Sequence, residues 1–268
     1  ITAIHELGHA LGLDHPFERD KFPGVNDTDD PGDNGLNAQP YTVMTYNDID
    51  ANEYMPEEEV DNGFLENLGA FDIAATQYLY GPNKNASTGD DTYYLDEEDS
   101  NGWYCIWDNG GTDTISAEDA ETSVSIDLRN ATLENEVGGG GYISQIGNDS
   151  LGLTIAYNST GDCIIENATG SDQDDTLRGN EVNNILDGGG GKDVVVFGNK
   201  KKDYTFQAID NSVNDGISSF NIQGTQKAGS ILKANEISTD PDSLSADSFQ
   251  ITSTKDDTST DSLLNIEV

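Results

Sequence analysis

The sequence is poor in basic residues, cysteine and histidine. It has 12 Lys and Arg against 51 Asp and Glu, which gives a formal net charge of -39. A charge of this size and sign argues against nucleic acids and anionic membrane surfaces as partners. Two cysteines in 268 residues exclude a disulfide-rich scaffold, and no apolar run approaches the length of a membrane span. These absences leave a chain that is suited to binding cations.

The hydrophobic content is also low, at 34%, whereas glycine reaches 29 residues. The chain is long enough for two modest domains. Such a composition provides few apolar residues for one large core. It is sufficient for small domains that have an additional source of stability. Because carboxylates at this density repel one another, we expect bound cations to stabilise the fold.

All three histidines lie in one short motif, HELGHALGLDH, which runs from His5 to His15. His5 and His9 are four residues apart, so both imidazoles project from one face of a helix. Gly12 supplies the turn that ends the helix, and His15 then returns as a third ligand. Three imidazoles form a zinc ligand set that leaves one position open for water, as in catalytic sites. Glu6 is placed to take a proton from that water as a general base.

The pattern H-E-x-x-H-x-x-G-x-x-H is the metzincin signature, and the alternative is a set of unrelated surface histidines on an amphipathic helix. Metzincins also have a methionine beneath the zinc, and the segment YTVMTY offers Met44 as this apolar floor. Tyr46 follows two residues later. On these residues the sequence resembles the serralysin family of secreted zinc proteases. The resemblance implies that Tyr46 stabilises the oxyanion of the tetrahedral intermediate; the alternative is that Met44 and Tyr46 are core residues.

The segment FLENLGAFDIAATQYLYG, residues 64–81, has apolar residues at intervals of three or four, which predicts a helix ended by Gly81 and Pro82. Its DIAATQYLYG part resembles the helix that closes the serralysin catalytic domain. We therefore predict an α+β chain in three parts. These are the C-terminal part of a metzincin catalytic domain (1–82), a calcium-binding β-sandwich or parallel β-roll with nonapeptide repeats (83–197), and a C-terminal β extension (198–268).

From Ser87 the sequence changes to short strand patterns between Gly, Asp and Asn turns, which indicates an all-β region. The segment IWDNGGTDTI is similar to the calcium-binding entry of the serralysin C-terminal domain. Carboxylates and backbone carbonyls on a tight loop are the oxygen ligands that calcium takes, and the alternative is a set of ordinary turn residues. By resemblance, one ion is held by Ser87, Gly89, Asp91, Asp108, Gly110 and Asp113. A second is held by Gly111, Asp113, Ile164 and Glu166.

A nine-residue period comes next, with Asp175, Asn184 and Asp193 nine residues apart. The segment GGGGKDVVV (188–196) fits the calcium-binding β-roll repeat, in which an apolar residue two positions after the Asp points into a thin core. Those apolar residues are Leu177, Leu186 and Val195. On one edge of the roll the expected calcium ligands are Asp175, Gly189, Gly191 and Asp193. Asn184 faces the other edge, where one fewer carboxylate weakens binding.

The two cysteines occupy matching places in this scheme. If Asp108, Asp113 and Glu166 share an ion, then Cys105 and Cys163, each three residues upstream of an acidic ligand, are neighbours. A disulfide is then plausible in an extracellular protein, and two buried free thiols are equally compatible with the sequence.

The resemblance implies a secreted, calcium-stabilised zinc endopeptidase that acts on proteins and peptides, with Zn²⁺ and Ca²⁺ as cofactors and a bacterial, type I-like export route. We expect a monomer that binds no nucleic acid and does not insert into membranes. Because only Ile1–Ile4 precede His5, we expect the chain to be a piece of a longer protein, to which the activity belongs. The alternative is a calcium-binding extracellular or adhesive module that carries an inactive protease remnant.

Overall fold

The computed structural model describes residues 2–19, 21–47, 64–95, 102–147, 152–197, 204–209, 221–224, 231–235, 248–253 and 264–267. Its contacts divide the chain into two compact units that alternate along the sequence. The first unit comprises Ile1–Asp90, Glu97–Gly111 and Asn130–Ile164, and the second comprises Asp91–Asp96, Thr112–Arg129 and Ile165–Val268. The division expected at residues 82 and 197 stays a prediction.

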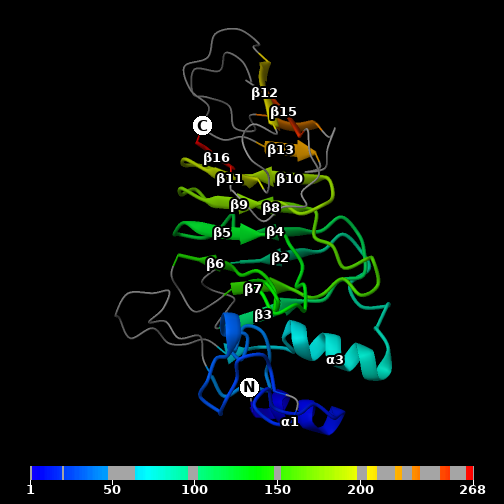
Figure 1. The fold of residues 1–268 in the computed structure, drawn as a ribbon. Coiled ribbons are helices and arrows are strands. Elements are labelled where there is room, and N and C mark those ends of the chain that lie inside the picture. Colours follow the sequence, from blue (N-terminus) through cyan, green and yellow to red (C-terminus); the bar gives the residue numbers. More distant parts are fainter. Residues whose placement is uncertain are drawn as a thin grey trace. The chain divides into compact units, whose positions relative to one another are not determined.

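In the part that the structure describes, the first unit combines two α-helices with short strands (Figure 1). Its elements are α1 (Thr2–Leu11), the short 3-10 helix η1 (Asp33–Gly35), β1 (Phe64–Leu65), α3 (Ala70–Tyr80), β3 (Gly102–Ile106), β6 (Ser144–Ile146) and β7 (Gly152–Ile155). The strands are ordered β1-β3-β7-β6, with β1, β3 and β7 parallel and β6 antiparallel to β7. Within the described residues, no helix has the length and hydropathy that a membrane crossing requires.

Helix α3 begins at Ala70, so the helix predicted from Phe64 is wrong over its first turns. Phe64 and Leu65 instead form β1 and pair with β3, which buries Leu65 almost completely. The helix starts after Gly69, whose N–H donates to the carboxylate of Asp72 at 2.9 Å and so caps the first turn. Strand pairing and this cap override the helical spacing of the apolar residues.

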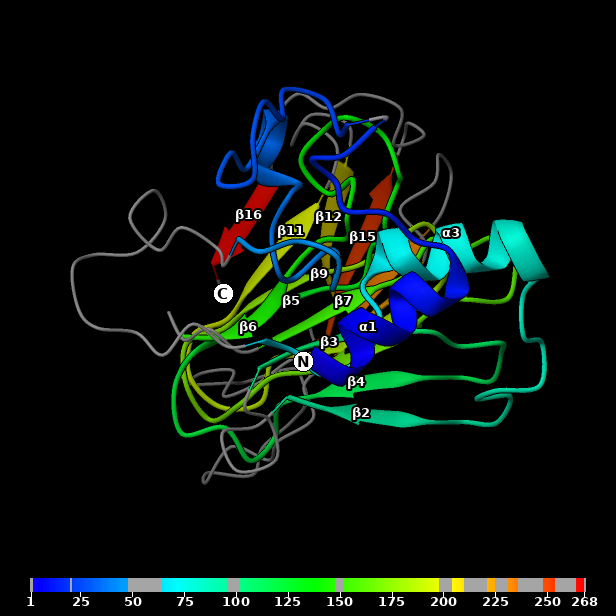
Figure 2. The ribbon, with the colours of Figure 1, turned by 90° about the horizontal axis from the view of Figure 1, so that it is seen from below.

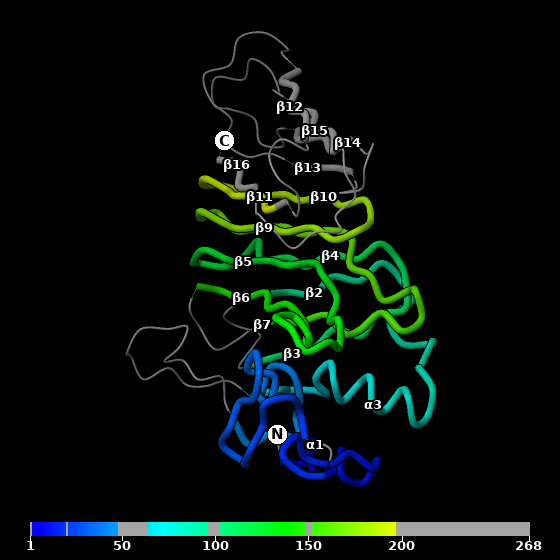
Figure 3. The backbone as a smooth tube through the Cα atoms, in the orientation of Figure 1, coloured from blue at the N-terminus to red at the C-terminus, as the bar shows by residue number. Residues whose placement is uncertain are grey.

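A small apolar core packs against α1 and the chain that returns beneath it. It consists of Leu13, Val43, Met44, Leu65 and Trp103. The tube in Figure 3 shows the connection after α1 folding back along the helix. Helices α1 and α3 lie side by side in Figure 2, and the Tyr80 hydroxyl donates to the Leu11 carbonyl at 2.8 Å. The end of α1 is therefore held both by core packing and by α3.

The described secondary-structure elements of the second unit are all strands. They are β2 (Thr92–Tyr94), β4 (Thr114–Ser116), β5 (Val124–Asp127), β8 (Asn167–Thr169), β9 (Thr176–Arg178), β10 (Asn184–Asp187), β11 (Val194–Phe197), β12 (Tyr204–Ile209), β13 (Asn221–Gly224), β14 (Ile231–Asn235), β15 (Ser248–Ser253) and β16 (Leu264–Glu267). One sheet has the order β12-β15-β14-β13-β10-β8-β4-β2, and its half from β10 to β2 is parallel. On the other sheet β5, β9 and β11 are parallel and β16 is antiparallel to β11.

Consecutive strands from β8 to β11 alternate between the two sheets, as the nine-residue period predicts. Figure 1 shows them as successive rungs. In register, one sheet aligns Ile115, Ala168 and Leu186, and the other aligns Ile126, Leu177 and Val195. All six are at most 2% exposed, so they form the thin apolar core of a roll. The predicted α+β fold class with a parallel β-roll is confirmed.

Candidate metal centres

A glycine turn at the end of α1 brings the three histidines together. Gly12 has φ +96°, a value that favours glycine, and its N–H donates to the His9 carbonyl at 3.0 Å. The N–H of Leu13 donates to the Gly8 carbonyl at 3.0 Å, which satisfies a second carbonyl of the last turn. The chain then reverses and places His15 beside the helix.

The three imidazoles converge through their Nε2 atoms. His15 Nε2 lies 3.2 Å from His9 Nε2 and 3.3 Å from His5 Nε2. Tetrahedral zinc with nitrogen ligands at about 2.0–2.1 Å requires nitrogen–nitrogen separations of roughly 3.3 Å. No other carboxylate, thiol or imidazole among the described residues joins this cluster. The donor set therefore fits one zinc ion with an open position.

Backbone carbonyls fix the tautomers of two of these ligands. His5 Nδ1 lies 2.7 Å from the Val43 carbonyl, and His9 Nδ1 lies 2.9 Å from the Leu13 carbonyl. Because a carbonyl only accepts, each Nδ1 carries the proton and each Nε2 keeps its lone pair free for a metal. Both rings are thus oriented for coordination by the fold itself.

Tyr46 and Glu6, the two residues predicted to act on substrate, both belong to this region. The Tyr46 hydroxyl lies 2.9 Å from His15 Nε2, and its ring stacks on His5 with centroids 5.5 Å apart. Tyr46 is 58% exposed, so this side of the cluster faces solvent. Glu6 follows His5 on α1 and is exposed.

Met44 packs against α1, and its role as the floor of a zinc site stays a prediction. It is 2% exposed, and a Cβ placed on Gly8 would lie 2.4 Å from the Met44 sulfur. Gly8 is therefore required by a close approach rather than by a turn. The sequence alone does not single out Gly8, because it stands at a variable position of the histidine motif.

Asp72 is a second residue that the sequence analysis missed. It is buried on α3, where it accepts hydrogen bonds from the Thr42 hydroxyl at 2.6 Å, the Val43 N–H at 2.7 Å and the Gly69 N–H. Burial raises the pKa of Asp72 to about 6, against the opposing effect of these three donors. Asp72 thereby fixes the chain at Val43, whose carbonyl orients His5. The available signal was the spacing of Gly69 and Asp72, an acidic residue three positions after a glycine, which is typical of a helix start.

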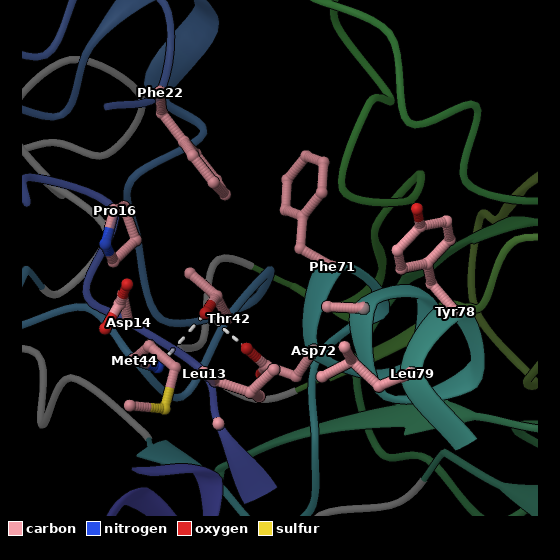
Figure 4. A pocket seen from close by; sticks show the side chains of 12 residues that line it. Leu13, Asp14, Pro16, Phe22, Thr42, Met44, Phe71, Asp72, Tyr78 and Leu79 are labelled. Atoms are coloured by element: carbon pink, nitrogen blue, oxygen red, sulfur yellow. Dashed lines mark hydrogen bonds between the residues drawn. The ribbon is translucent and has the colours of Figure 1, made fainter. Parts of the chain in front are cut away.

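An apolar cavity of about 430 Å³ adjoins this support on the side of α3. In Figure 4 the dashed hydrogen bonds of Thr42 to Asp72 and to Met44 form part of its wall. The cavity is lined by Gly12, Leu13, Asp14, Pro16, Phe22, Thr42, Met44, Phe71, Asp72, Ala75, Tyr78 and Leu79. The cavity thus lies next to Thr42, Met44 and Asp72, and none of the three histidines lines it.

The calcium ligands predicted around the Asp108–Asp113 loop are divided between the two units. In the first unit, Asp108 is fully buried and accepts the N–H of Gly110 at 2.7 Å. The Ser87 carbonyl, an expected ligand, accepts the N–H of Asn109 at 2.8 Å. Also in this unit are Gly89, Gly111 (φ +148°) and Ile164. Their roles as ligands stay predictions.

In the second unit, three predicted ligands lie in contact around Asp113. The carboxylate of Asp113 accepts the N–H of Asp91 at 2.7 Å, and the Asp113 N–H donates to Glu166 Oε2 at 2.8 Å. Asp113 is fully buried. Carboxylate oxygens of Asp91 and Asp113 lie within 4.8 Å of each other, and a buried pair of this kind favours a cation beside it.

The Asp175 edge of the roll concentrates negative charge in the same way. Asp175 and Asp193 are both buried, and the Asp175 N–H donates to Asp193 Oδ1 at 3.1 Å. Burial, reinforced by the charges of Asp175, Asp174 and Asp187, raises the pKa of Asp193 to about 6. Burial also raises the pKa of Asp175. Each carboxylate is destabilised in its charged form, which a bound cation would relieve.

Two predicted glycines bring the neighbouring turn close to this edge. Gly189 has φ +82°, and a Cβ there would lie 2.1 Å from the Ser171 carbonyl oxygen. Gly191 has φ +99°, and a Cβ there would lie 2.4 Å from the Gln173 carbonyl oxygen. The stacked turns therefore set backbone oxygens beside the carboxylates, which is the mixed ligand set that calcium takes.

The opposite edge of the roll is closed by amides. The Asn180 side-chain nitrogen donates to the carbonyls of Leu128 at 3.0 Å and Ile165 at 2.8 Å. The Asn184 side-chain nitrogen donates to the Glu166 carbonyl and to Asn180 Oδ1, both at 2.9 Å. N–H groups here bind the carbonyls that a cation would otherwise need. This edge is thus satisfied by the chain alone.

Cys105 and Cys163 are not joined in a disulfide, and both are fully buried in the first unit. Burial raises the pKa of the Cys105 thiol to about 12. A thiol with so high a pKa carries almost no thiolate at neutral pH and is unreactive. The sequence left open a disulfide or two buried thiols, and the structure has the two buried thiols.

Comparison with known proteins finds two matching family models. A family model described as Met-zincin matches residues 1–101, and one described as peptidase M10 serralysin C terminal matches residues 70–233. Serralysin of Proteus mirabilis is 32% identical over 200 residues, which are 69% of this chain and 36% of that protein. Metalloprotease AprA of Pseudomonas entomophila is 31% identical over 208 residues, or 69% and 37%.

Metallopeptidase AprA of Pseudomonas marginalis is 29% identical over 180 residues, which are 61% of this chain and 36% of that protein. The chain thus spans little more than a third of the length of these relatives. The second family model covers more than half of the chain, across both units. On this evidence the chain belongs to the peptidase M10 serralysin C-terminal family, as part of a serralysin-like metzincin.

Proposed function

We propose that the protein containing this chain is a secreted, calcium-stabilised zinc endopeptidase that hydrolyses peptide bonds in proteins. One observation carries the proposal: three Nε2 atoms converge at 3.2–3.3 Å while Nδ1 of His5 and His9 is already engaged by carbonyls. This arrangement leaves unshared electron pairs directed at one point, which is the requirement of a metal site.

When bound by His5, His9 and His15, zinc would lower the pKa of a water molecule and polarise the substrate carbonyl. Glu6 takes the proton from the attacking water and passes it to the leaving amine nitrogen, so that one residue serves as base and then as acid. Tyr46 donates a hydrogen bond to the oxygen that becomes negatively charged. Its exposure and its position beside His15 suit this role.

Calcium has a separate role in the proposal. The carboxylates of Asp91 and Asp113 repel one another, as do those along the Asp175 edge, so the second unit folds fully only when calcium is bound. Outside the cell calcium is abundant, and folding is completed there. At the low calcium of the cytosol the same repulsion would keep this region unfolded and competent for a type I-like export. We propose a monomer that acts on proteins and peptides and binds no nucleic acid.

The test uses the full-length parent protein with millimolar calcium and casein as substrate. We expect wild type to cleave casein and to retain about one zinc per chain by mass spectrometry. Glu6→Ala should keep the zinc and lose activity by about 10²- to 10⁴-fold, the contribution typical of a general base. Glu134→Ala, which removes an exposed carboxylate elsewhere in the first unit, should leave activity unchanged. Zinc binding without cleavage by wild type would instead support a calcium-binding module with an inactive protease remnant.

A further inference from the structure

The third zinc ligand differs from the other two in what holds its ring. His15 Nδ1 is buried and makes no hydrogen bond, whereas the Nδ1 atoms of His5 and His9 each contact a backbone carbonyl. Among the described residues, the group that faces His15 Nδ1 is the carboxylate of Glu18, with its Oε1 3.4 Å away. A zinc-bound imidazole needs an acceptor at its second nitrogen, because that contact fixes the tautomer and the ring orientation.

A tight turn delivers Glu18 to this position. The Glu18 N–H donates to the His15 carbonyl at 3.0 Å, which closes a four-residue turn with Pro16 at its second position. Phe17 stacks on the His15 ring with centroids 4.7 Å apart and planes inclined by 13°. The ring is thus supported on its face by Phe17 and at its Nδ1 edge by Glu18.

We propose that Glu18 is a positioning residue for His15: its carboxylate accepts the Nδ1–H and directs Nε2 of His15 to the zinc. The proposal rests on the proposed function, since it presumes a zinc ion on the three histidines. Unlike the two carbonyls, Glu18 also contributes a negative charge, which increases the basicity of the imidazole and favours a cation beside it. The Glu18 side chain is half exposed, so its effect on overall stability is small.

Zinc affinity of the parent protein is the first readout, measured by competition with a chromogenic chelator in excess calcium. Glu18→Ala should weaken zinc binding by about 10- to 100-fold, the usual cost of losing a second contact of a ligating histidine. Glu18→Gln retains an acceptor oxygen without the charge, so its loss should be smaller than that of Glu18→Ala. Arg19→Ala is the matched control, because Arg19 is the next residue, is largely exposed and pairs with Asp14 instead. It should bind zinc like wild type.

A second readout separates positioning from folding. The visible spectrum of the cobalt-substituted protein reports the ligand field, so Glu18→Ala should shift its bands while the thermal midpoint of the metal-free protein stays unchanged. Equal zinc affinity and equal cobalt spectra in wild type, Glu18→Ala and Glu18→Gln would overturn the role of Glu18. That result would leave the protease proposal intact as long as wild type binds zinc and cleaves casein. A wild type that binds no zinc would overturn both.

Discussion

The histidine cluster of the first unit and the Asp175 edge of the second unit are two candidate metal sites of opposite design. In the cluster, neutral rings are held in place by backbone carbonyls and by an apolar floor at Met44. At the edge, burial and the neighbouring carboxylates raise the pKa of Asp193, and burial raises the pKa of Asp175. The ligands of the first site are already oriented without a metal, whereas the charged carboxylates of the second site are destabilised until a cation binds. Ligands that are held in place before binding suit a catalytic site. Carboxylates that repel one another make folding depend on the binding of an ion.

The largest expected effect concerns the support of the histidine cluster. Asp72→Ala leaves the Thr42 hydroxyl and the Val43 and Gly69 N–H groups without their acceptor in a buried place. We expect a loss of about 3 kcal/mol or more in the free energy of unfolding, together with weaker zinc binding. Urea unfolding and zinc competition measure the two effects. An unchanged midpoint would show that Asp72 is not the support that the geometry indicates, and Glu134→Ala serves as the surface control.

Removing calcium is the next largest perturbation, and it acts on the carboxylate edge. When the free calcium concentration is about 100 times the dissociation constant of a site, binding adds about 2.7 kcal/mol to the free energy of unfolding. Removing calcium with a chelator should therefore clearly lower the thermal midpoint of the parent protein. Asp193→Asn should reduce both the number of calcium ions bound and the midpoint shift that calcium produces. A midpoint that does not depend on calcium would remove the contrast between the two regions.

The amide edge of the roll allows the comparison to be made within one unit. Asn180→Asp replaces the donors to the Leu128 and Ile165 carbonyls by a carboxylate that repels them. We expect a loss of about 1–3 kcal/mol without calcium, which added calcium restores because the new carboxylate and the carbonyls form an oxygen ligand set. Isothermal titration should show additional calcium binding compared with wild type. Asn180→Ala should be destabilised without that rescue.

The smallest effect is the pH dependence of the calcium-free protein. The pKa of Asp193 is raised to about 6 in the folded state, above its ordinary value of 3.8, so the folded state binds the proton more tightly than the unfolded state. Stability from this group is therefore present at low pH and is lost as the pH rises through 6. Asp72 shifts in the same direction. We expect the thermal midpoint of the metal-free protein to be higher at pH 5 than at pH 7. The difference between the two midpoints should be smaller in Asp193→Asn than in wild type.

With calcium bound, the direction should reverse, because protons then compete with the ion for the carboxylates. Calcium affinity should fall between pH 7 and pH 5. If wild type and Asp193→Asn have the same pH dependence without calcium, the account of this edge is wrong.

Local sequence patterns predicted the parts of the molecule whose geometry is local. The histidine spacing and Gly12 indicate the helix and its turn, and the nine-residue period indicates the buried positions Leu177, Leu186 and Val195. Contacts distant in sequence were not readable. Asp72 binds a segment about thirty residues away, and Gly8 is fixed by the approach of Met44. The helical spacing from Phe64 was outweighed by strand pairing with β3, which no local pattern shows.

The same reasoning applies to the amide edge. Asn184 was interpreted as a weaker calcium ligand because only its place in the repeat was visible. Its hydrogen-bond partner Asn180 is only four residues away in the sequence. The carbonyls that complete the network come from other turns of the roll. A side chain that replaces an ion is therefore recognised only when the stacking of the turns is known.

The most direct test of the account is a zinc K-edge X-ray absorption spectrum of the full-length parent protein with one equivalent of zinc and saturating calcium. We expect three imidazole nitrogens at about 2.0–2.1 Å, with the multiple-scattering pattern of histidine and one or two oxygen ligands. A first shell made of oxygens alone, without imidazole scattering, would place the zinc on the acidic surface and contradict the three-histidine centre.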